Sequence, residues 1–427
     1  MVFQQGKKSK KATSEKTRGT GIAALLGIYV LFGLAQASNE YRVLFLENLG
    51  MTATQCGQVL AAASLLMAVS RPLAGVLADK LRSRRTVYIS ALILWIMALV
   101  SMLLTQHVRL AGFLLCAGIV PFLSVSEPVT YGMIEASGAN ASLMYPKLDF
   151  SLIRVCLSIG YCAINFLYTP IVDRFGPSAP FVCTLFYIVG MLALSGTLRK
   201  FETVRPEERV AGTPRQKLEL NRLFKNYFLV AFILLNFLTA IGGHTQYYLV
   251  FLLDTVGLDK SLIGVTTGIR VAGEIIIMPL IPLIKRRVSL PMLQAFTGVF
   301  TALQAVVFLT ASNPYVILGA TLLGGISSGI SLGTTAVYLR MMAPEGLDTT
   351  TLSLSTVMGS LGGIIIDLTG GIVIDTLGIF ALYRISLSVL VLWIVLYFGT
   401  WAFGVHVLKK TPVVPMFLKR DKTVWKQ

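Results

Sequence analysis

The sequence predicts an all-α integral membrane protein, with twelve transmembrane helices in two pseudo-symmetric bundles of six helices. Three observations predict this fold class. Hydrophobic residues make up 55% of the 427 positions and charged residues only 13%, whereas a soluble chain carries about 25% charged residues. The apolar residues fall into successive runs near the ~20 residues that a bilayer crossing requires. Motifs of the first half also recur in the second half.

The apolar runs divide the chain in order. The predicted spans cover residues 20–46, 55–79, 86–105, 110–134, 149–171 and 178–198, and then 226–253, 260–284, 289–311, 314–342, 350–372 and 379–405. The first run is too long for the core of a signal peptide, so we expect it to remain as a span. The predicted parts are a basic tail (1–19), an N-terminal bundle (20–198), a charged linker (199–225), a C-terminal bundle (226–405) and a second basic tail (406–427).

The positive charges occupy alternate connections. The net charge of +17 is compatible with nucleic-acid binding, but lysine and arginine gather in the two tails, in the linker, in the stretch from Arg71 to Arg85 and at residues 285–287. The other connections hold almost none. This asymmetry follows the positive-inside rule and predicts a multi-pass protein of the plasma or inner membrane, with both termini in the cytoplasm and no nucleic-acid partner.

Two sets of residues recur between the halves. The first set is Gly50, Gly57 and Pro72, which recur at a constant offset as Gly257, Gly264 and Pro279. The second set is Ser158, Gly160, Asp173 and Gly176, which recur as Ser360, Gly362, Asp375 and Gly378. Parallel repeats of this kind relate two bundles by an axis along the membrane normal, with the substrate expected between them at mid-membrane.

The stretch from Arg71 to Arg85 closes one apolar run and opens the next, so we interpret it as a short loop between the second and third spans. Its order of glycine, acid and basic cluster resembles the signature loop between helices 2 and 3 of the major facilitator superfamily of secondary transporters. The resemblance implies the major facilitator fold and a latch that stabilises the outward-open state. The latch residues are then Gly75, Asp79, Lys80, Arg84 and Arg85.

Ionisable residues within the spans are the main functional signal, because each costs at least ~2.5–3.5 kcal/mol near mid-bilayer. They are Glu40, Arg42, Arg71, Glu127, Asp149, Arg154, Arg270, Glu274, Asp367 and Arg384. Arg270 and Glu274 are four residues apart, which places them on one face of the eighth span. They are candidates for substrate binding, or form a structural ion pair that orients helices.

The fifth span carries a second resemblance. Arg154, Gly160 and Tyr161 resemble the helix-5 motif of lactose permease and its relatives, and Gly273-Glu274 parallels the Gly-Glu of helix 8 in that family. The resemblance implies that Arg154 donates hydrogen bonds to the substrate and that Tyr161 stacks on it. The wider relatives include nucleoside symporters.

The chain also departs from lactose permease. The helix-4 glutamate of that family falls nearest Tyr131, with Glu127 one turn earlier on a similar face. The histidine and glutamate of its helix 10, which carry proton coupling there, have no equivalent in this sequence. These differences argue against lactose as the substrate and against the same proton route.

Three carboxylates are candidates for proton coupling. Asp367 lies midway along the eleventh span, where its repeat partner is the neutral Asn165. Apolar surroundings favour the neutral form of a carboxyl, which suits a proton carrier. A carboxyl that is hydrogen-bonded to a neighbouring helix is the equal alternative. Glu127, which precedes Pro128, and Glu274 are the other two candidates.

Polar aromatic and amide residues complete the predicted substrate cavity. They are Asn39, Tyr131, His244, Gln246 and Tyr247. The adjacent Gly242 and Gly243 are expected to break the seventh span, as in other transporters. A lone histidine in a helix is more often structural, so a packing role for His244 stays open.

Taken together, these patterns predict a secondary active transporter that works by alternating access. The first hypothesis is a proton-coupled symporter that imports a small polar solute, namely a sugar, glycoside or nucleoside. A proton-coupled efflux antiporter and a non-transporting receptor or scaffold are the alternatives. We expect no enzyme activity, catalytic residues, metal or cofactor, because the sequence lacks a nucleophile–base pair, a metal-ligand cluster and a phosphate loop. The expected partners are the solute, protons and the bilayer, and the expected functional state is a monomer.

Overall fold

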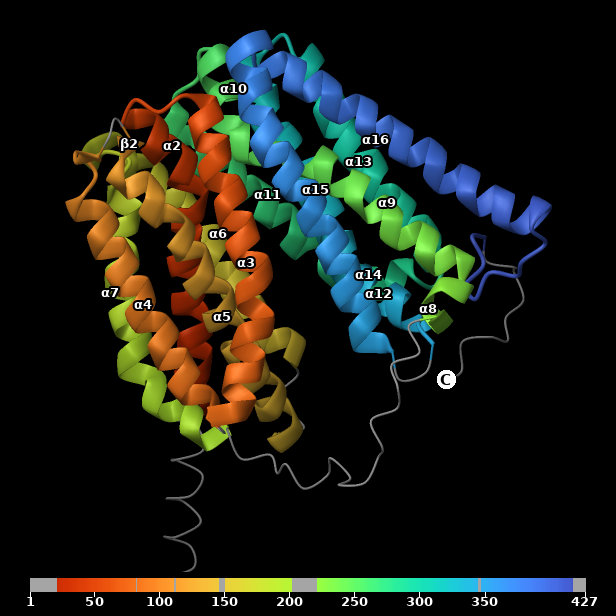
Figure 1. The fold of residues 1–427 in the computed structure, drawn as a ribbon, viewed down its shortest axis with the longest axis horizontal. Coiled ribbons are helices and arrows are strands. Elements are labelled where there is room, and N and C mark those ends of the chain that lie inside the picture. The colour runs from red at the N-terminus through yellow and green to blue at the C-terminus, as the bar shows by residue number, and fades with distance from the viewer. Residues whose placement is uncertain are drawn as a thin grey trace, which may run out of the picture. The chain divides into compact units, whose positions relative to one another are not determined.

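The computed structural model describes residues 21–81, 83–110, 113–145, 150–201, 221–344 and 347–417 (Figure 1). The two predicted tails, apart from the first residues of the second tail, and most of the predicted linker lie outside these residues. Among the described residues, eleven helices are long and apolar enough to cross a membrane. Helix α5, Leu115–Met144, lies where the fourth span is predicted. The all-helical membrane fold is therefore confirmed.

The elements follow the predicted spans closely. The first half contains a helix over residues 21–36, then η1 (Ala37–Tyr41), α2 (Arg42–Asn48), α3 (Ala53–Leu81), α4 (Arg84–Leu104), α5, α6 (Phe150–Phe175), α7 (Ala179–Leu194) and η2 (Ser195–Phe201). The second half contains α8 (Asn221–Lys225), α9 (Tyr227–Gly243), η4 (His244–Tyr248), α10 (Leu249–Thr255), η5 (Lys260–Leu262), α11 (Ile263–Ile277), η6 (Met278–Leu280), α12 (Ile281–Ile284), α13 (Leu290–Thr310), α14 (Pro314–Met342), α15 (Asp348–Leu377), α16 (Ile379–Ala402) and η7 (Phe403–Val407).

The stretch from Arg71 to Arg85 is mostly helix, so its interpretation as a loop is wrong. Helix α3 continues to Leu81, and α4 begins at Arg84 after Ser83, whose hydroxyl accepts a hydrogen bond from the Thr86 backbone N–H. The apolar spacing of Leu73, Leu77 and Leu81 keeps the helical period to the end of α3. Of the predicted latch residues, Gly75 and Asp79 belong to α3, but their surroundings lie outside what the structure describes.

The fourth span begins later than predicted. Two short strands, β1 (Arg109–Leu110) and β2 (Phe113–Leu114), pair antiparallel before it. The backbone N–H of Leu115 donates to the Val108 carbonyl at 2.9 Å, which closes this hairpin. Apolar composition alone cannot separate such a hairpin from the start of the helix that follows.

The first helix of each half is broken at the same place. In the second half the break is η4, which begins directly after Gly243 and confirms the break that the glycine pair predicts. In the first half η1 interrupts the helix at the equivalent position, with the same offset as between Gly50 and Gly257. The internal repeat therefore extends to the local geometry of the backbone.

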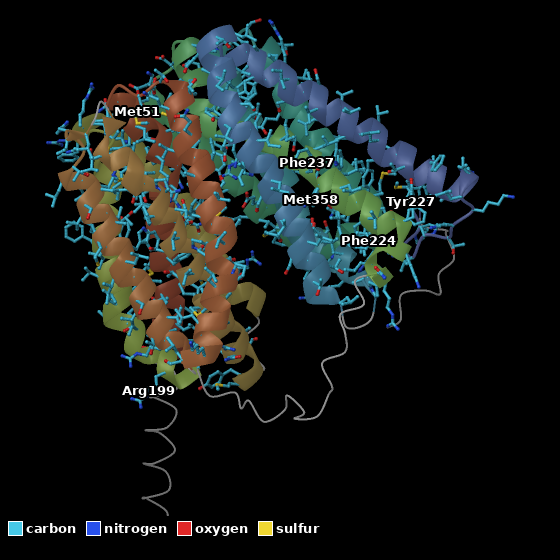
Figure 2. All side chains as sticks on the ribbon, viewed as in Figure 1. Met51, Arg199, Phe224, Tyr227, Phe237 and Met358 are labelled. Carbon is cyan, nitrogen blue, oxygen red and sulfur yellow. The ribbon has the colours of Figure 1, made fainter. Side chains whose placement is uncertain are left out.

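The chain divides into two compact units. Unit 1 comprises Met1–Leu49 and Ala62–Ala211, and unit 2 comprises Gly50–Ala61 and Gly212–Gln427. In unit 1, α4 packs along α5, and in unit 2, α11 packs along α14 and α9 along α15. Figure 2 labels Phe237 on α9 and Met358 on α15. A side chain added at Gly362 of α15 would meet the Phe237 carbonyl, so glycine permits this close packing.

The start of α3 belongs to unit 2. The backbone N–H groups of Ala53 and Thr54 donate to the two carboxylate oxygens of Asp375, at 3.1 and 2.8 Å. An acidic side chain at a helix N-terminus satisfies free donors and complements the helix dipole. Asp375 therefore caps α3 from the end of α15.

Residues beyond η7 pack back onto unit 2. Val414 and Met416 join a buried cluster that includes Leu223 and Leu290. The Ser289 hydroxyl donates to the Met416 carbonyl, and the Lys410 ammonium lies 5.8 Å from the ring centre of Tyr227, which Figure 2 labels at the start of α9. This segment is thus part of the core of unit 2.

Candidate functional site

Unit 1 holds a buried polar cluster around Glu127 of α5. The Asn39 amide of η1 donates to Glu127 Oε2, and the Arg42 guanidinium of α2 lies 3.5 Å from the same oxygen. Arg42 also donates to the Ser124 hydroxyl at 2.6 Å. The break at η1 brings Asn39 and Arg42 to one carboxylate, so Glu127 is paired as a carboxylate in the membrane should be.

A second cluster of unit 1 surrounds Glu135, which the sequence analysis missed. Arg154 of α6 lies 3.8 Å from Glu135 Oε1, and the Tyr131 hydroxyl donates to the same oxygen at 2.5 Å. The Tyr131 ring stacks on Phe32. Arg154 and Glu135 keep 41% and 31% of their side-chain surface exposed, so this pair is open to a polar solute.

The sequence does contain a signal for Glu135. It lies four residues after Tyr131 and eight after Glu127, so all three occupy one face of α5. The arginine of the lactose-permease-like motif therefore pairs with Glu135, in the turn after Tyr131. Glu135, one turn after Tyr131, is thus the helix-4 carboxylate that meets Arg154, rather than Glu127, one turn before it.

Tyr161 is engaged through its hydroxyl. It donates to Glu40 Oε1 of η1 at 2.5 Å, while the Asn165 amide one turn later donates to the Tyr161 carbonyl at 2.8 Å. The ring is half-buried. The predicted stacking residue is thus tied to the same broken segment that supplies Asn39 and Arg42.

In unit 2, Arg270 and Glu274 of α11 form the pair that their spacing predicts, at 3.5 Å. Both side chains are largely buried. Glycines hold α11 against α14: a Cβ at Gly325 would lie 1.9 Å from the Arg270 carbonyl oxygen, and one at Gly329 would meet the Ile277 side chain. Close helix approach through small residues therefore fixes the backbone that carries the pair.

The second ionisable pair of unit 2 joins η4 to α15. His244 Nδ1 lies 3.9 Å from Asp367 Oδ1. The Tyr247 ring packs edge-on against the imidazole at 5.5 Å, and the Tyr248 hydroxyl donates to the Asp367 carbonyl at 2.7 Å. The broken seventh span thus places His244, Tyr247 and Tyr248, all from η4, close to Asp367.

The MFS_1 like family matches residues 23–385, which is most of the chain. The chain belongs to this family. It is accordingly a major facilitator secondary transporter and a multi-pass integral membrane protein, not an enzyme. The predicted resemblance to the major facilitator superfamily is confirmed. No curated protein matches the chain at a significant level.

Solved transporters share the fold of this MFS_1 like protein. The nucleoside transporter NupG is 16% identical, with 89% of this chain and 99% of that chain covered and a TM-score of 0.70. A D-xylose-proton symporter is 14% identical over 89% and 97% of the two chains, with a TM-score of 0.66. The peptide transporter POT is 13% identical over 89% and 95%, with a TM-score of 0.66. Identities this low establish the fold alone.

The remaining predicted residues of the MFS_1 like protein lie elsewhere in the two units. Gln246 lies half-buried on η4 between Thr245 and Tyr247, and Arg384 is exposed on α16. The side chains of Arg71 and Asp149 lie outside the described residues. Lys80 is exposed at the end of α3, while Arg84 and Arg85 are half-buried at the start of α4.

Proposed function

We propose that this MFS_1 like protein is a proton-coupled symporter that imports a small polar solute, namely a sugar, glycoside or nucleoside. The observation that carries the proposal is that each unit holds carboxylate–cation pairs inside membrane-spanning helices. Replacing such pairs by apolar side chains is often neutral or stabilising, so they are poor devices for stability. Their presence is best explained by solute binding and proton movement.

The proposed roles follow the clusters. In unit 1, Arg154, Tyr131, Tyr161 and Asn39 contact the solute, and Glu127 serves both binding and coupling. In unit 2 the solute-binding residues are Arg270, Glu274, His244, Gln246 and Tyr247, with Glu274 and Asp367 as the other coupling carboxylates. The residues Gly75, Asp79, Lys80, Arg84 and Arg85 form the latch. Both termini face the cytoplasm, and the monomer is the transporting unit.

The half-buried Arg154–Glu135 pair supports a solute with several hydroxyl or amide groups. Such a solute can accept from the guanidinium and donate to the carboxylate at once, so both partners stay hydrogen-bonded when the pair opens. Tyr131 beside it offers a ring and a hydroxyl to the same solute. A purely lipophilic cation would leave Arg154 unsatisfied, which argues against efflux of such compounds.

The test begins with thermal shifts of the detergent-purified protein against uridine, xylose, lactose, a dialanine peptide and a lipophilic cation. A ligand at 100 times its dissociation constant adds about 2.7 kcal/mol of apparent stability. We expect a shift with uridine or a sugar that is lost in Arg154→Ala and Glu274→Gln and kept in Arg384→Ala, the matched exposed control. A shift with the lipophilic cation alone would instead indicate efflux, and no shift at all would favour the scaffold.

Proton coupling is tested with the compound of this panel that stabilises the protein. Proteoliposomes that contain a pH-sensitive dye should acidify when the compound is added outside, and an imposed inward proton gradient should raise its uptake. Uptake that is equal with and without the gradient contradicts the symport.

A further inference from the structure

The three carboxylates proposed for proton coupling do not all face the same type of basic residue. Glu127 faces Arg42 and Glu274 faces Arg270, each at 3.5 Å. Arginine does not release its proton at any physiological pH, so a proton on either glutamate would leave a buried guanidinium without its counter-charge. Asp367 faces a histidine instead. Histidine gains and loses a proton near neutral pH, so in this pair both partners can titrate.

The two side chains of the pair differ in how much of their surface is exposed. The Asp367 side chain is 1% exposed, whereas the His244 side chain is 30% exposed. The 3.9 Å between Nδ1 and Oδ1 is longer than a hydrogen bond, so transfer of a proton requires the imidazole to move toward the carboxyl. The imidazole, as the more exposed partner, is the one through which a proton reaches the carboxyl.

The surface of α15 is shaped to receive the imidazole. Gly363 lies one turn before Asp367, on the same face of the helix, and a Cβ there would lie 2.5 Å from His244 Cε1. Gly370, on the other side of Asp367, leaves room for the Tyr248 ring, which a Cβ would meet at 3.0 Å. Glycine on both sides of the carboxyl thus seats η4 directly against it.

The other ionisable groups around the pair come from each element packed on this part of α15. Tyr247 and Tyr248 belong to η4, Cys56 lies at the start of α3 near Tyr248, and Tyr383 lies in α16. Asp375 lies two turns further along α15, where it caps α3. Arg384 of α16 is exposed. The one ionisable residue of α9 is Tyr227, at the end of the helix far from His244.

We propose that His244 and Asp367 form one proton-binding site that carries the coupled proton, so that of the three carboxylates proposed for coupling Asp367 holds the proton while Glu127 and Glu274 stay paired with their arginines. One proton binds at the imidazole, which becomes imidazolium. Its Nδ1–H then passes to Oδ1 of Asp367, so the imidazolium returns to neutral imidazole while the carboxylate becomes a carboxylic acid. The net charge of the pair is zero in both arrangements, and a second proton can bind only at the cost of a net positive site. Its use in transport rests on the proposed symport, whereas its existence does not.

The site is tested by titration of histidine resonances in the full-length protein labelled with ¹⁵N-histidine, without any solute. The chain has three histidines, His107, His244 and His406, and His244→Gln identifies the relevant signal. In the wild-type protein we expect His244 to titrate over more than one step, because protonation of Asp367 changes its surroundings. The signal of the exposed His107 serves as the reference in the same spectra. A single-step curve for His244 in the wild-type protein overturns the proposal.

Variants sharpen the test. In Asp367→Asn we expect the His244 curve to become a single step, because the second titrating group of the pair is gone. Glu274→Gln, which removes a carboxylate held by an arginine, should leave the His244 curve unchanged. If Asp367→Asn does not fold, the wild-type curve still decides. Uptake that does not depend on a proton gradient would contradict the proposed symport but not the proposed proton-binding site. An unchanged His244 curve in Asp367→Asn would contradict the site, whatever drives transport.

Discussion

Gly325→Ala should weaken the packing that positions the Arg270–Glu274 pair. Gly325 faces the backbone of α11, and a Cβ there would lie 1.9 Å from the Arg270 carbonyl oxygen. Ordinary contact begins at 3.4 Å, so α11 and α14 must separate locally by about 1.5 Å. The obstacle is backbone, which cannot rotate away as a side chain can. The whole helix face, including the pair, has to shift.

The loss of stability caused by the clash can be measured by comparing two glycine variants of the same helix, α14. Overpacking of a close interface costs about 1–3 kcal/mol, while glycine to alanine in a helix gains about 1 kcal/mol from propensity. Gly319 lies on the same helix with nothing within 4 Å of an added Cβ. Gly319→Ala therefore has the same gain without the clash, and the difference between the two variants should be about 1–3 kcal/mol.

The measurement is the apparent melting temperature of both variants in the same detergent, with size-exclusion profiles to confirm that each is folded. We expect Gly325→Ala to melt below the wild-type protein and Gly319→Ala at or above it. Equal melting temperatures for the two variants would refute the close approach of α14 to α11. Binding of the stabilising compound should also weaken in Gly325→Ala alone, because Arg270 moves with its backbone.

Two further substitutions probe the surface of α15. Gly363→Ala places a methyl group against the His244 ring, so we expect the ¹⁵N resonances of His244 to shift and proton-driven uptake to fall. Gly359→Ala, whose nearest neighbour lies at 3.5 Å, should change neither. Asp375→Asn removes the charge and leaves one acceptor oxygen for the N–H groups of Ala53 and Thr54, which should lower stability by about 0.5–1.5 kcal/mol, as for one lost hydrogen bond. Hydrogen exchange of the first turn of α3 should then become faster.

Each of these variants has an outcome that would contradict the packing described above. An unshifted His244 resonance in Gly363→Ala would mean that the imidazole does not lie over α15. Unchanged exchange at the start of α3 in Asp375→Asn would show that the cap does not hold the first turn. Asp254→Asn is the control for the second case, because Asp254 has 58% of its side-chain surface exposed and faces Lys260.

Features that depend on local spacing were predictable from the sequence. Span positions follow from apolar runs, and the Arg270–Glu274 pair follows from the helical period, because both residues belong to one helix. The break before His244 follows from two consecutive glycines. The equivalent break at η1 has no glycine, and it emerges only when the repeat is used to transfer the break from one half to the other.

Pairings between helices were not predictable in the same way. Arg154 and Glu135 belong to different helices, and Glu127, Tyr131 and Glu135 follow one another at intervals of about one turn on α5, so spacing alone does not say which of them meets Arg154. His244 and Asp367 are far apart in the sequence, and only the packing of η4 on α15 shows that they meet. The helical end of the Arg71 to Arg85 stretch was missed because charge marks the membrane boundary, whereas a helix continues past that boundary until a cap ends it.

The segment after η7 affects how unit 2 is made. Val414 and Met416 complete a cluster that also contains residues from the first helices of that unit. Synthesis proceeds from the N-terminus, so this part of the core stays open until residues 414–416, which follow the last span, have been made. Translation that stops shortly after α16 would release all the spans of unit 2 with an apolar surface uncovered, a state that quality-control proteases are suited to recognise.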